Sequence, residues 1–397
     1  MAKKILLFSP PFNGHLNVLK NLIWKYRNYF DFHLVITGWK NIQPNLKGVT
    51  VPVTILAHSD LNETDPAIWT FPRIIELFDD CLDLIKKERP DLIIYDFFSL
   101  EGNLAGKILG VPYWSSIPAL VGPSNTDYLK TKLGLSKNVT ATDDIEKKFP
   151  GALNLSHVET ISDGFHIPGQ TNLIWSYPAL TPIDFMTNRR SSSYNFVGHL
   201  DTPMASRMEP ETQSRPLVYF SLGTVVMNNL WNQQIAVREK LKTFIGRLAE
   251  LWKDRQINVL FVSQGKSMLN SYPSNWKVVT YADQVSVLSQ ASVFITHAGG
   301  NSFHEAVLKK VPMVAIPFFG DQPLVASQIE KLGLGVNLVT DSGIDTRKSK
   351  DFINASLADK VDGAVTKIVN NLEGYKNKFS QLSLESQNIF ELLNPRV

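Results

Sequence analysis

Cysteine is almost absent from the sequence, which holds a single one, Cys81, among 397 residues. One thiol forms no internal disulfide, and this favours a reducing compartment and a cytoplasmic location. Cys81 falls in an apolar pattern of helical spacing with Phe78 and Ile85. We therefore expect it to lie in a hydrophobic core.

Long apolar segments and a large excess of either charge are lacking too. The apolar start at residues 1–8 stops at Pro10-Pro11, too early for a signal peptide, and no later stretch is long enough to span a bilayer. We expect no transmembrane anchor. The formal net charge is +3, from 40 Lys and Arg against 37 Asp and Glu. This balance, without a basic run, argues against a nucleic-acid partner.

Three familiar motifs are incomplete. No Gly-x-Gly-x-x-Gly follows the first apolar run, which argues against a nicotinamide-dependent dehydrogenase. The segment 264–267 ends like a phosphate loop, but Leu260 stands where that loop needs its first glycine. His304-Glu305 lacks a second histidine one turn further on, so it does not make a zinc-protease helix.

The first half of the chain alternates short apolar runs with segments of helical periodicity. Strands are expected at residues 4–9, 32–37, 91–95, 111–116, 173–176 and 195–197, and helices at 17–30 and 99–110. Ser99 is a candidate N-cap, and Gly110 followed by Pro112 marks the end of the second helix. This alternation predicts a doubly wound parallel sheet, interrupted by a less regular helical insertion at 125–168.

A second alternation begins at Leu217. Strands are expected at 217–221, 258–263, 276–281, 293–296 and 313–317, and helices at 234–252, 285–290, 302–310 and 322–331. The fold class is therefore α/β, with two Rossmann-like doubly wound domains facing a cleft, where ligands bind at the carboxyl ends of the strands. The predicted boundaries are 1–205 for the first domain, 206–216 for a linker, 217–370 for the second domain, and 371–397 for a helical tail that crosses back to pack on the first domain.

The segment Thr296–Glu305 predicts a phosphate site. A strand ends, Gly299 and Gly300 follow, and a helix begins at about position 302. Glycines let a ligand approach the backbone, and the free N–H groups of a helix start attract phosphate. His297 stands where it donates to a phosphate oxygen, and the carboxylate of Glu305, one turn into the helix, accepts two ribose hydroxyls. A plain strand-to-helix turn with a solvated Glu305 is the alternative for this segment alone.

Three further groups follow other predicted strands and favour a nucleotide sugar as the ligand. The small-residue turn at 221–224 offers a second phosphate contact. Residues 281–284 offer an aromatic face and an amide, which suit a nucleobase. Residues 321–322 offer a carboxylate and an amide, which suit sugar hydroxyls.

In this order, the segments resemble the donor signature of inverting glycosyltransferases of the GT-B fold. This family includes plant and bacterial UDP-sugar glycosyltransferases and macrolide glycosyltransferases. The signature runs from an aromatic-x-x-Gln, through His-x-Gly-x-Asn-Ser-x-x-Glu, to a proline and then Asp/Glu-Gln. The matching residues are Tyr281, Gln284, His297, Gly299, Asn301, Ser302, Glu305, Pro312, Pro317, Asp321 and Gln322. The general pattern covers nearly the whole chain, with a divergent middle.

The resemblance implies a role for each matching residue in binding the donor. By this resemblance Tyr281 stacks on the base, Gln284 reaches the ribose or base, His297, Asn301 and Ser302 bind the diphosphate, Glu305 binds the ribose, and Asp321 and Gln322 bind the transferred sugar. The predicted donor-binding set also includes Gly14, Ser221, Gly223, Thr224, Gly299 and Gly300. Tyr281 replaces the usual Trp, Asp283 a usual Pro and Gly300 the plant-type Trp, so the base and the sugar stay open.

His15 and Asp96 are the candidate catalytic pair. His15 follows Gly14 at the first strand-to-helix turn, where Gly14 allows a tight turn, and Asp96 ends the strand at 91–95, so both reach the same sheet edge. An imidazole titrates near neutrality, which suits a general base for an acceptor hydroxyl. The resemblance agrees, since the family places a His in a Gly-His turn after the first strand and an Asp after a later one. Capping roles for His15 and for Asp96 are the alternatives.

Together these features predict inverting transfer of a hexose, with glucose favoured, from a UDP- or TDP-sugar to a hydroxyl of a small lipophilic acceptor. No Asp-x-Asp stands where a metal-dependent sugar transferase needs it. A helix dipole and an imidazole stabilise a leaving diphosphate, so we expect neither a metal nor a cofactor. The alternatives are a nucleotide-sugar epimerase, a lipid-linked glycosyltransferase on the same fold, and a non-catalytic nucleotide-sugar-binding protein.

Apolar residues near strand ends or in loops of the first domain predict the acceptor pocket. They are Phe12, Trp69, Phe71, Phe97, Phe98, Trp114, Ile117 and Leu120. Ordinary core packing is the alternative for each of them.

Overall fold

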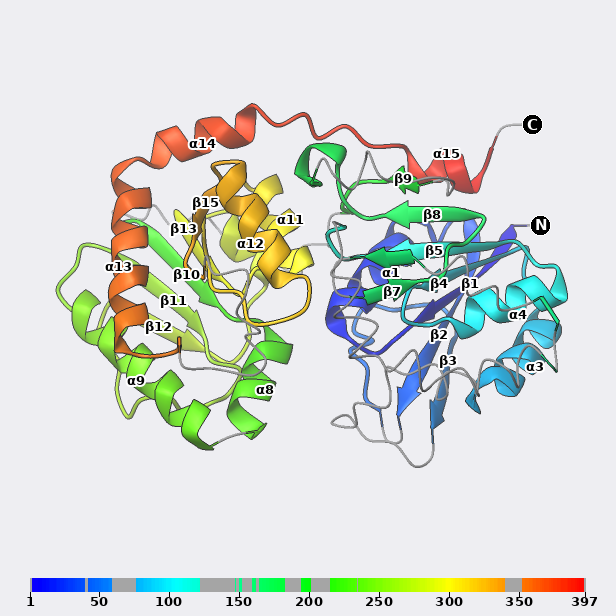
Figure 1. The fold of residues 1–397 in the computed structure, drawn as a ribbon, viewed down its shortest axis with the longest axis horizontal. Helices are drawn as coiled ribbons and strands as arrows, with labels where there is room; N and C mark the ends of the chain where they lie inside the picture. Colours follow the sequence, from blue (N-terminus) through cyan, green and yellow to red (C-terminus); the bar gives the residue numbers. More distant parts are fainter. Residues whose placement is uncertain are drawn as a thin grey trace. The chain divides into compact units, whose positions relative to one another are not determined.

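The computed structural model of the protein describes residues 2–39, 42–58, 76–121, 147, 150–151, 159–161, 164–182, 194–200, 215–233, 235–339 and 352–395. Contacts divide the chain into two compact units (Figure 1). Unit 1 comprises Met1–Pro203 and Leu384–Val397, and unit 2 comprises Met204–Ser383. Most of the predicted linker at 206–216 and of the insertion expected at 125–168 lies outside the described residues.

Unit 1 contains a parallel sheet with the strand order β3-β2-β1-β4-β5-β8-β9. Its strands are β1 (Lys3–Ser9), β2 (Phe30–Trp39), β3 (Val53–His58), β4 (Leu92–Asp96), β5 (Tyr113–Ile117), β8 (Thr171–Ile174) and β9 (Tyr194–Phe196). The apolar residues of β1 and β4 run on without alternation, as expected for strands covered on both faces. The winding direction reverses between β1 and β4, which is where doubly wound sheets bind their ligands.

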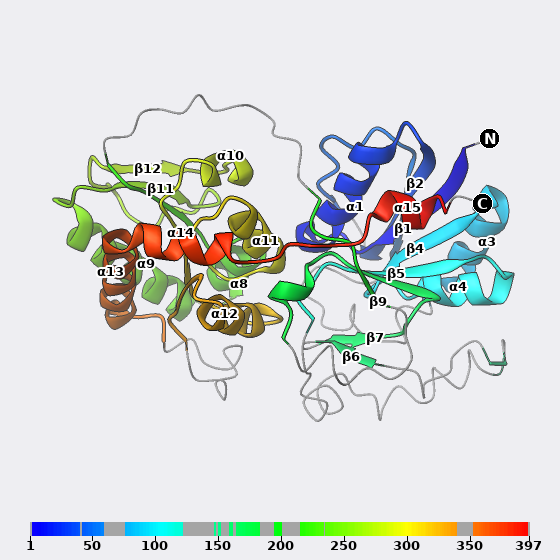
Figure 2. The same cartoon turned by 90° about the horizontal axis from the view of Figure 1, so that it is seen from above.

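Helices cover both faces of this sheet (Figure 2). They are α1 (Asn13–Tyr26), α3 (Phe78–Glu88), α4 (Glu101–Leu109) and α15 (Ile389–Leu393), with a 3-10 turn η3 (Pro178–Leu180) and a small hairpin of β6 (Glu159–Ile161) and β7 (Gly164–His166). Helices α1 and α15 share a core layer with Ile5 and Leu7, whereas α3 and α4 share one with Leu6 and Phe8. Successive side chains of β1 therefore anchor both helical layers.

Unit 2 contains a second parallel sheet, with the order β12-β11-β10-β13-β14-β15. Its strands are β10 (Leu217–Ser221), β11 (Asn258–Val262), β12 (Trp276–Val279), β13 (Val293–Thr296), β14 (Met313–Ala315) and β15 (Gly335–Asn337). Here the winding reverses between β10 and β13. The carboxyl ends of these two strands are thus the expected ligand-binding edge of unit 2.

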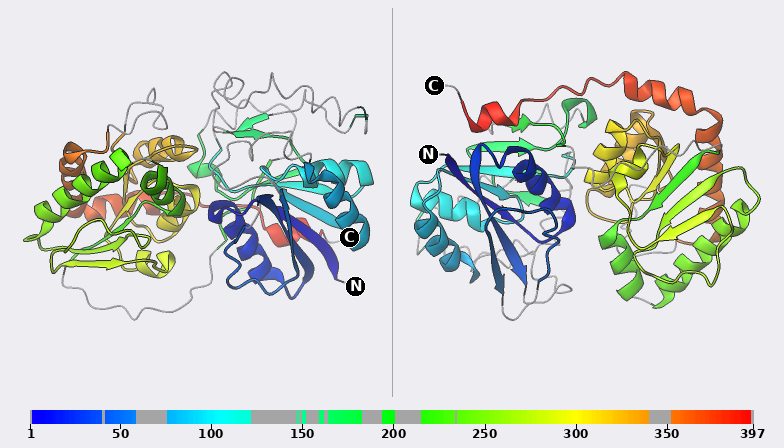
Figure 3. Two further views of the ribbon diagram at one scale, coloured as in Figure 1. Left: turned by 90° about the horizontal axis from the view of Figure 1, so that it is seen from below. Right: turned by 180° about the vertical axis from the view of Figure 1, so that it is seen from behind.

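Seven helices are described in unit 2, on both faces of its sheet (Figures 1 and 3). They are α8 (Thr224–Gln233), α9 (Ile235–Trp252), α10 (Gln284–Leu288), α11 (Gly300–Leu308), α12 (Gln322–Lys331), α13 (Ala355–Asn370) and α14 (Leu372–Ser380). Helices α9 and α13 form the core on one face with Val218 and Phe220. Helices α11 and α12 lie on the other face, to which the intervening Tyr219 points.

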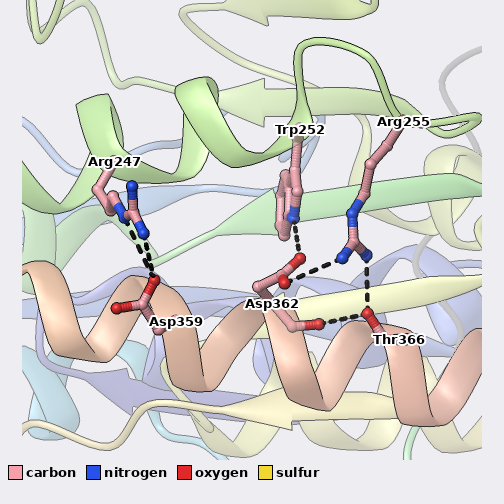
Figure 4. A network of polar contacts seen from close by, with 6 residues as sticks. All are labelled: Arg247, Trp252, Arg255, Asp359, Asp362 and Thr366. Carbon is pink, nitrogen blue, oxygen red and sulfur yellow. Dashed lines mark hydrogen bonds and ion pairs between the residues drawn. The ribbon is translucent and has the colours of Figure 1, made fainter.

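A polar network joins α9 to α13 (Figure 4). The indole Nε1 of Trp252 donates to Oδ1 of Asp362 at 2.7 Å, and Arg255 donates to Oδ2 of Asp362 at 3.0 Å and to Thr366 Oγ1 at 2.7 Å. Nearer the start of both helices, Arg247 pairs with Asp359. The network fixes how the two helices align on their shared face of the sheet.

Most of the predicted elements are present, with shifted ends. The strands at 217–221 and 293–296 and the helix at 322–331 have the predicted bounds. The helix expected at 17–30 instead spans Asn13–Tyr26, because Phe30 is already the first residue of β2. Ser99 does not cap α4, since its hydroxyl lies 3.1 Å from that of Thr37 and the helix begins at Glu101.

Several elements were not predicted, and the tail differs from expectation. The insertion at 125–168 was expected to be helical, but its described residues include the hairpin of β6 and β7. Strands β3 and β15 are short or only partly buried, and α8 carries no clear helical periodicity. We expected the whole tail at 371–397 to pack on the first domain. Instead α14 packs within unit 2, and only the part from Leu384 groups with unit 1. Among the described residues, no helix is both long and apolar enough to cross a membrane.

Candidate functional site

The first helix of unit 1 places His15 beside Asp96. Helix α1 follows β1 directly, and Asp96 ends β4, the neighbour of β1, so both residues lie where the winding reverses. Nδ1 of His15 lies 3.0 Å from each carboxylate oxygen of Asp96. Asp96 is fully buried, and its Oδ1 also accepts the N–H of Phe98 at 3.0 Å. Because a carboxylate only accepts, the proton of the neutral imidazole sits on Nδ1.

This tautomer leaves the lone pair of His15 Nε2 available. Nε2 makes no hydrogen bond to any described residue, and the side chain is 18% exposed. The neighbouring carboxylate stabilises the cation that forms when Nε2 takes up a proton. The capping alternative explains only part of the geometry: Asp96 holds the turn at Phe98 while it also orients His15, and no side chain caps α1.

Gly14 does not have the conformational role that was predicted for it. The residue is exposed in the first turn of α1, and its φ is not positive. A Cβ placed on Gly14 would meet nothing within 4 Å. The turn therefore does not require a glycine, and the prediction that Gly14 is needed for a tight turn is wrong.

Aromatic rings surround His15. The ring centroids of Phe98, Phe97 and Phe12 lie 4.9, 5.4 and 6.2 Å from that of the imidazole. Phe97 and Phe98 stack on each other, and Phe12 packs on Trp39, which ends β2. Sequence reasoning missed Trp39, because only the pairing of β1 with β2 brings it to this edge. These rings border the imidazole of His15 with apolar surface.

The rest of the predicted acceptor set is placed differently. Trp69 and Phe71 lie outside the described residues. Trp114 is the second residue of β5 and has Nζ of Lys3 5.8 Å from its ring, so it lies at the amino edge of the sheet, away from His15. Ile117 and Leu120 are fully buried in the core. The assignment of Trp114 is wrong, because nearness to a strand end was counted without regard to which end it was. Ile117 ends β5 at the carboxyl edge and Leu120 follows it, so their burial favours the alternative of core packing.

Two strand-to-helix turns lie side by side in unit 2. Ser221 pairs with Thr296 on neighbouring strands, so the turn at 221–224 before α8 adjoins the turn at 296–300 before α11. Gly299 is the N-cap of α11, and no side chain caps this nine-residue helix. The uncapped N–H groups and the helix dipole together favour an anion here. The two turns are suited to bind a diphosphate.

The imidazole of His297 lies between these two turns. A Cβ on Gly223 would lie 2.5 Å from Cε1 of the ring, and one on Gly299 would overlap Nε2. Gly223 also has a φ of 72°, which few other residues adopt. The residue keeps some exposed surface, but its Nδ1 is buried without a hydrogen-bond partner among the described residues. Burial lowers the pKa of His297 to about 4, so the ring is neutral near pH 7.

Gln284 connects the start of α10 to α11. Its Nε2 lies 2.6 Å from Oε2 of Glu305 and 3.0 Å from Oγ of Ser302. On the other side, its Oε1 lies 3.2 Å from the hydroxyl of Tyr219. The structure thus brings together three residues predicted to bind the donor. Tyr219 was missed, because a tyrosine in an apolar strand looks like ordinary core.

Tyr281 precedes this group as an exposed aromatic side chain. It is 74% exposed, the second-highest exposed fraction among the described large apolar residues that lie at the surface. Asp283, which departs from the family pattern, is the N-cap of α10, where its carboxylate accepts from the N–H and the hydroxyl of Ser286. This departure therefore has a structural reason, since it fixes the helix that carries Gln284.

Asp321 and Gln322 follow β14, the neighbour of β13, so they lie at the same sheet edge as the two turns. Oε1 of Gln322 accepts the N–H groups of Phe318 and Phe319 at 2.8 and 3.2 Å. Its Nε2 makes no hydrogen bond to any described residue. The amide thus holds its own turn with one end and leaves a donor at the other.

The family of the chain follows from comparison with known proteins. Residues 167–383 match the family model described as UDP-glucoronosyl and UDP-glucosyl transferase. This stretch is more than half of the chain and contains the whole donor signature. The chain belongs to this family. One relative is the uncharacterized UDP-glucosyltransferase YojK of Bacillus subtilis (strain 168), 28% identical over 265 residues, which are 63% of this chain and 61% of YojK. The match thus spans about three fifths of that relative's length.

Solved structures show the same fold. The calicheamicin glycosyltransferase CalG4 superimposes with a TM-score of 0.67 at 17% identity, over 96% of this chain and 94% of its own. The glycosyltransferase VinC, in complex with DTDP, superimposes with a TM-score of 0.62 at 17% identity, over 98% of both chains. The predicted family and the fold class of two doubly wound α/β domains are therefore confirmed.

Proposed function

We propose that the chain is an inverting glycosyltransferase. It moves a hexose, with glucose favoured, from a UDP- or TDP-sugar to a hydroxyl of a lipophilic small molecule, without a metal or cofactor. The observation that carries this proposal is the His15–Asp96 pair, in which both carboxylate oxygens hold Nδ1 at 3.0 Å and Nε2 is left open. A protein that only binds a nucleotide sugar has no need of a base oriented in this way.

Unit 2 supports the proposed donor. Its paired turns at 221–224 and 296–300 suit a diphosphate. Glu305 lies one turn further along α11 and is hydrogen-bonded to Gln284, and this placement suits a ribose attached to that diphosphate. The exposed ring of Tyr281 offers a face for the base. YojK is named a UDP-glucosyltransferase and VinC was solved with DTDP, and these names support a uridine or thymidine diphosphate sugar.

The reaction is a single in-line displacement. Nε2 of His15 takes the proton of the acceptor hydroxyl, and the resulting oxygen forms a bond to the anomeric carbon. The bond from that carbon to the diphosphate breaks with its electron pair, so the nucleoside diphosphate leaves with the additional charge. The N-terminus of α11 and Nε2 of His297 stabilise this charge. One displacement inverts the configuration at the anomeric carbon.

The surroundings of His15 support a lipophilic acceptor. Phe12, Phe97 and Phe98 border the imidazole, and Trp39 extends this surface. An aromatic or hydrocarbon acceptor loses water on such a surface, and this favours its binding over that of a sugar or a charged acceptor.

The proposal is tested by His15→Ala and Asp96→Asn. With UDP-glucose and a panel of phenolic, polyketide and sterol acceptors, we expect turnover to fall by roughly 100- to 10,000-fold in His15→Ala, the usual contribution of a general base. Asp96→Asn should lower kcat in the same direction, because an amide does not stabilise the imidazolium. UDP affinity, measured by calorimetry, should stay unchanged in both variants.

His33→Gln provides the control. His33 is also buried in unit 1 and also lies near a carboxylate, at 3.5 Å from Glu88, but it belongs to the middle of β2. Its replacement should leave turnover per folded molecule near normal. Near-normal turnover of His15→Ala would show that the proposed mechanism is wrong. Tight donor binding with no turnover on any acceptor would favour a non-catalytic binding protein.

A further inference from the structure

The amide of Gln284 has a protein partner for each of its hydrogen-bonding ends. Nε2 lies within hydrogen-bond distance of both Glu305 and Ser302, and Oε1 lies 3.2 Å from Tyr219. An amide nitrogen carries two protons, and these two acceptors use both of them. These contacts leave little of the Gln284 amide to donate hydrogen bonds directly to a base or a ribose.

The chemistry of the partners fixes the orientation of this amide. An ionised carboxylate accepts hydrogen bonds and donates none, so the NH₂ end must face Glu305. The carbonyl end then faces Tyr219, whose hydroxyl must donate to it. Burial raises the pKa of Tyr219, so the hydroxyl keeps its proton at any physiological pH. The hydrogen bonds from Tyr219 to Gln284 and from Gln284 to Glu305 therefore run in one direction, and Ser221 also contacts the Tyr219 hydroxyl.

Tyr219 is held firmly enough to define this orientation. It lies in the middle of β10, is 1% exposed, and stacks on Phe294 of the neighbouring strand β13 at a centroid distance of 4.8 Å. A central strand is the most rigid support that a sheet offers. Its hydroxyl thus provides a fixed point from which the amide and then the carboxylate are placed.

We propose that Tyr219 is a positioning residue for the nucleotide: its hydroxyl orients Gln284, which in turn holds Glu305 and Ser302 in place for the ribose and the adjoining phosphate. The inference rests on the proposed function, because it concerns the same donor site. It also assigns Gln284 a different role from the predicted one, since Gln284 acts through Glu305 rather than by contact with the base. Without the Tyr219 hydroxyl, the carbonyl end of the amide loses its partner, and the side chain of Gln284 is held only through Nε2.

The test is the variant Tyr219→Phe in the full chain, which keeps the ring stacked on Phe294 and removes one hydroxyl. We expect UDP, titrated by calorimetry, to bind roughly 3- to 10-fold more weakly, as for the loss of one hydrogen bond to a buried network. The loss should be smaller for 2′-deoxy-UDP, which offers Glu305 one hydroxyl fewer. In turnover, the KM for the donor should rise while kcat changes little.

Two comparisons separate positioning from a general structural effect. In a Gln284→Ala background, Tyr219→Phe should weaken UDP binding less than it does in the unmodified chain, because the hydroxyl then retains only its contact with Ser221. Tyr272→Phe is the matched control: this tyrosine of unit 2 stacks on Trp276 at 5.7 Å, and its hydroxyl contacts neither Gln284 nor Glu305. It should bind UDP as the unmodified chain does.

Three results would overturn the inference: unchanged UDP affinity in Tyr219→Phe, an equal loss for UDP and 2′-deoxy-UDP, or an equal loss with and without Gln284. Each of them leaves the proposed function intact, because the unmodified chain would still bind UDP and transfer sugar. Failure of the unmodified chain to bind either UDP or TDP would instead overturn the proposed function, and the inference with it.

Discussion

At the scale of single residues, two imidazoles in the chain have opposite surroundings. His15 faces the carboxylate of Asp96, which stabilises a positive charge on the ring. His297 lies between Gly223 and Gly299 with its Nδ1 buried and unpartnered among the described residues, so a positive charge there is costly. The first environment suits a group that accepts a proton. The second suits a neutral hydrogen-bond donor to an anion.

Glu101 provides a residue-scale prediction about pH. It lies in the first turn of α4, is 3% exposed, and its Oε2 has no hydrogen-bond partner among the described residues. Burial raises the pKa of Glu101 from 4.5 to about 8. Between these values the unfolded chain releases a proton that the folded chain retains. The free energy of unfolding therefore falls as pH rises, by up to about 1.4 kcal/mol per pH unit.

We expect Glu101→Gln to remove most of this slope between about pH 6.5 and 8. Urea unfolding of both proteins at the two pH values measures it. The buried His199 and His297, whose pKa values are lowered to about 4, change their protonation on unfolding mainly below this window. Glu373→Gln, at a side chain that is 81% exposed, is the control. Equal slopes in the unmodified chain and Glu101→Gln would contradict the prediction.

At the scale of elements, the contact between α9 and α13 depends on one carboxylate. Asp362 accepts from both Trp252 and Arg255 and has a side chain 19% exposed, whereas Asp359 lies in an ion pair and is 54% exposed. Loss of the Asp362 carboxylate would leave the part-buried indole N–H of Trp252 without its acceptor. Loss of the Asp359 carboxylate would leave Arg247 to water.

We expect Asp362→Ala to destabilise unit 2 by about 1–3 kcal/mol, the usual cost of unsatisfied part-buried donors. Asp359→Ala on the same helix should cost less than about 1 kcal/mol, as for an exposed ion pair. Urea unfolding monitored by tryptophan fluorescence compares the two variants. A larger loss for Asp359→Ala than for Asp362→Ala would refute the assignment.

At the scale of the whole molecule, each unit has its own core, and the end of the chain belongs to the first. Ile389 and Leu393 of α15 are buried among side chains of α1, β1 and β2, and Nζ of Lys3 donates to the carbonyl of Leu393. Among the described residues, the core cluster that α9 and α13 form with the sheet of unit 2 runs from Val218 to Tyr375 and contains no residue of α15. Damage to α15 should therefore be confined to unit 1.

We expect Leu393→Ala to destabilise unit 1 by about 2–5 kcal/mol, because it removes a fully buried side chain. UDP affinity, which the proposed function assigns to unit 2, should not change at a temperature where both units are folded. Differential scanning calorimetry and UDP titration give the two readouts, and Leu392→Ala at the half-buried neighbouring position is the control. Loss of UDP binding together with stability would show that the units do not behave independently.

The sequence by itself determined the features that depend on neighbours along the chain. Uninterrupted apolar runs such as Leu217–Ser221 identify buried parallel strands, and the order of residues from Tyr281 to Gln322 identifies the family, since both patterns need only local spacing. The sequence also predicted that His15 and Asp96 lie close together, because the carboxyl ends of parallel strands share one edge of the sheet.

Only the tertiary structure decided the contacts made across the sheet. The register of β5 places Trp114 near the amino edge of its sheet. The pairing of β1 with β2 brings Trp39 to the edge where His15 lies. The placement of α10 beside β10 makes Tyr219 a hydrogen-bond partner of Gln284. When strand pairing brings a side chain next to a site, the residues around it in the sequence do not indicate that contact. The physical reason is that strand register is set by the packing of both faces at once, and a linear pattern does not record that packing.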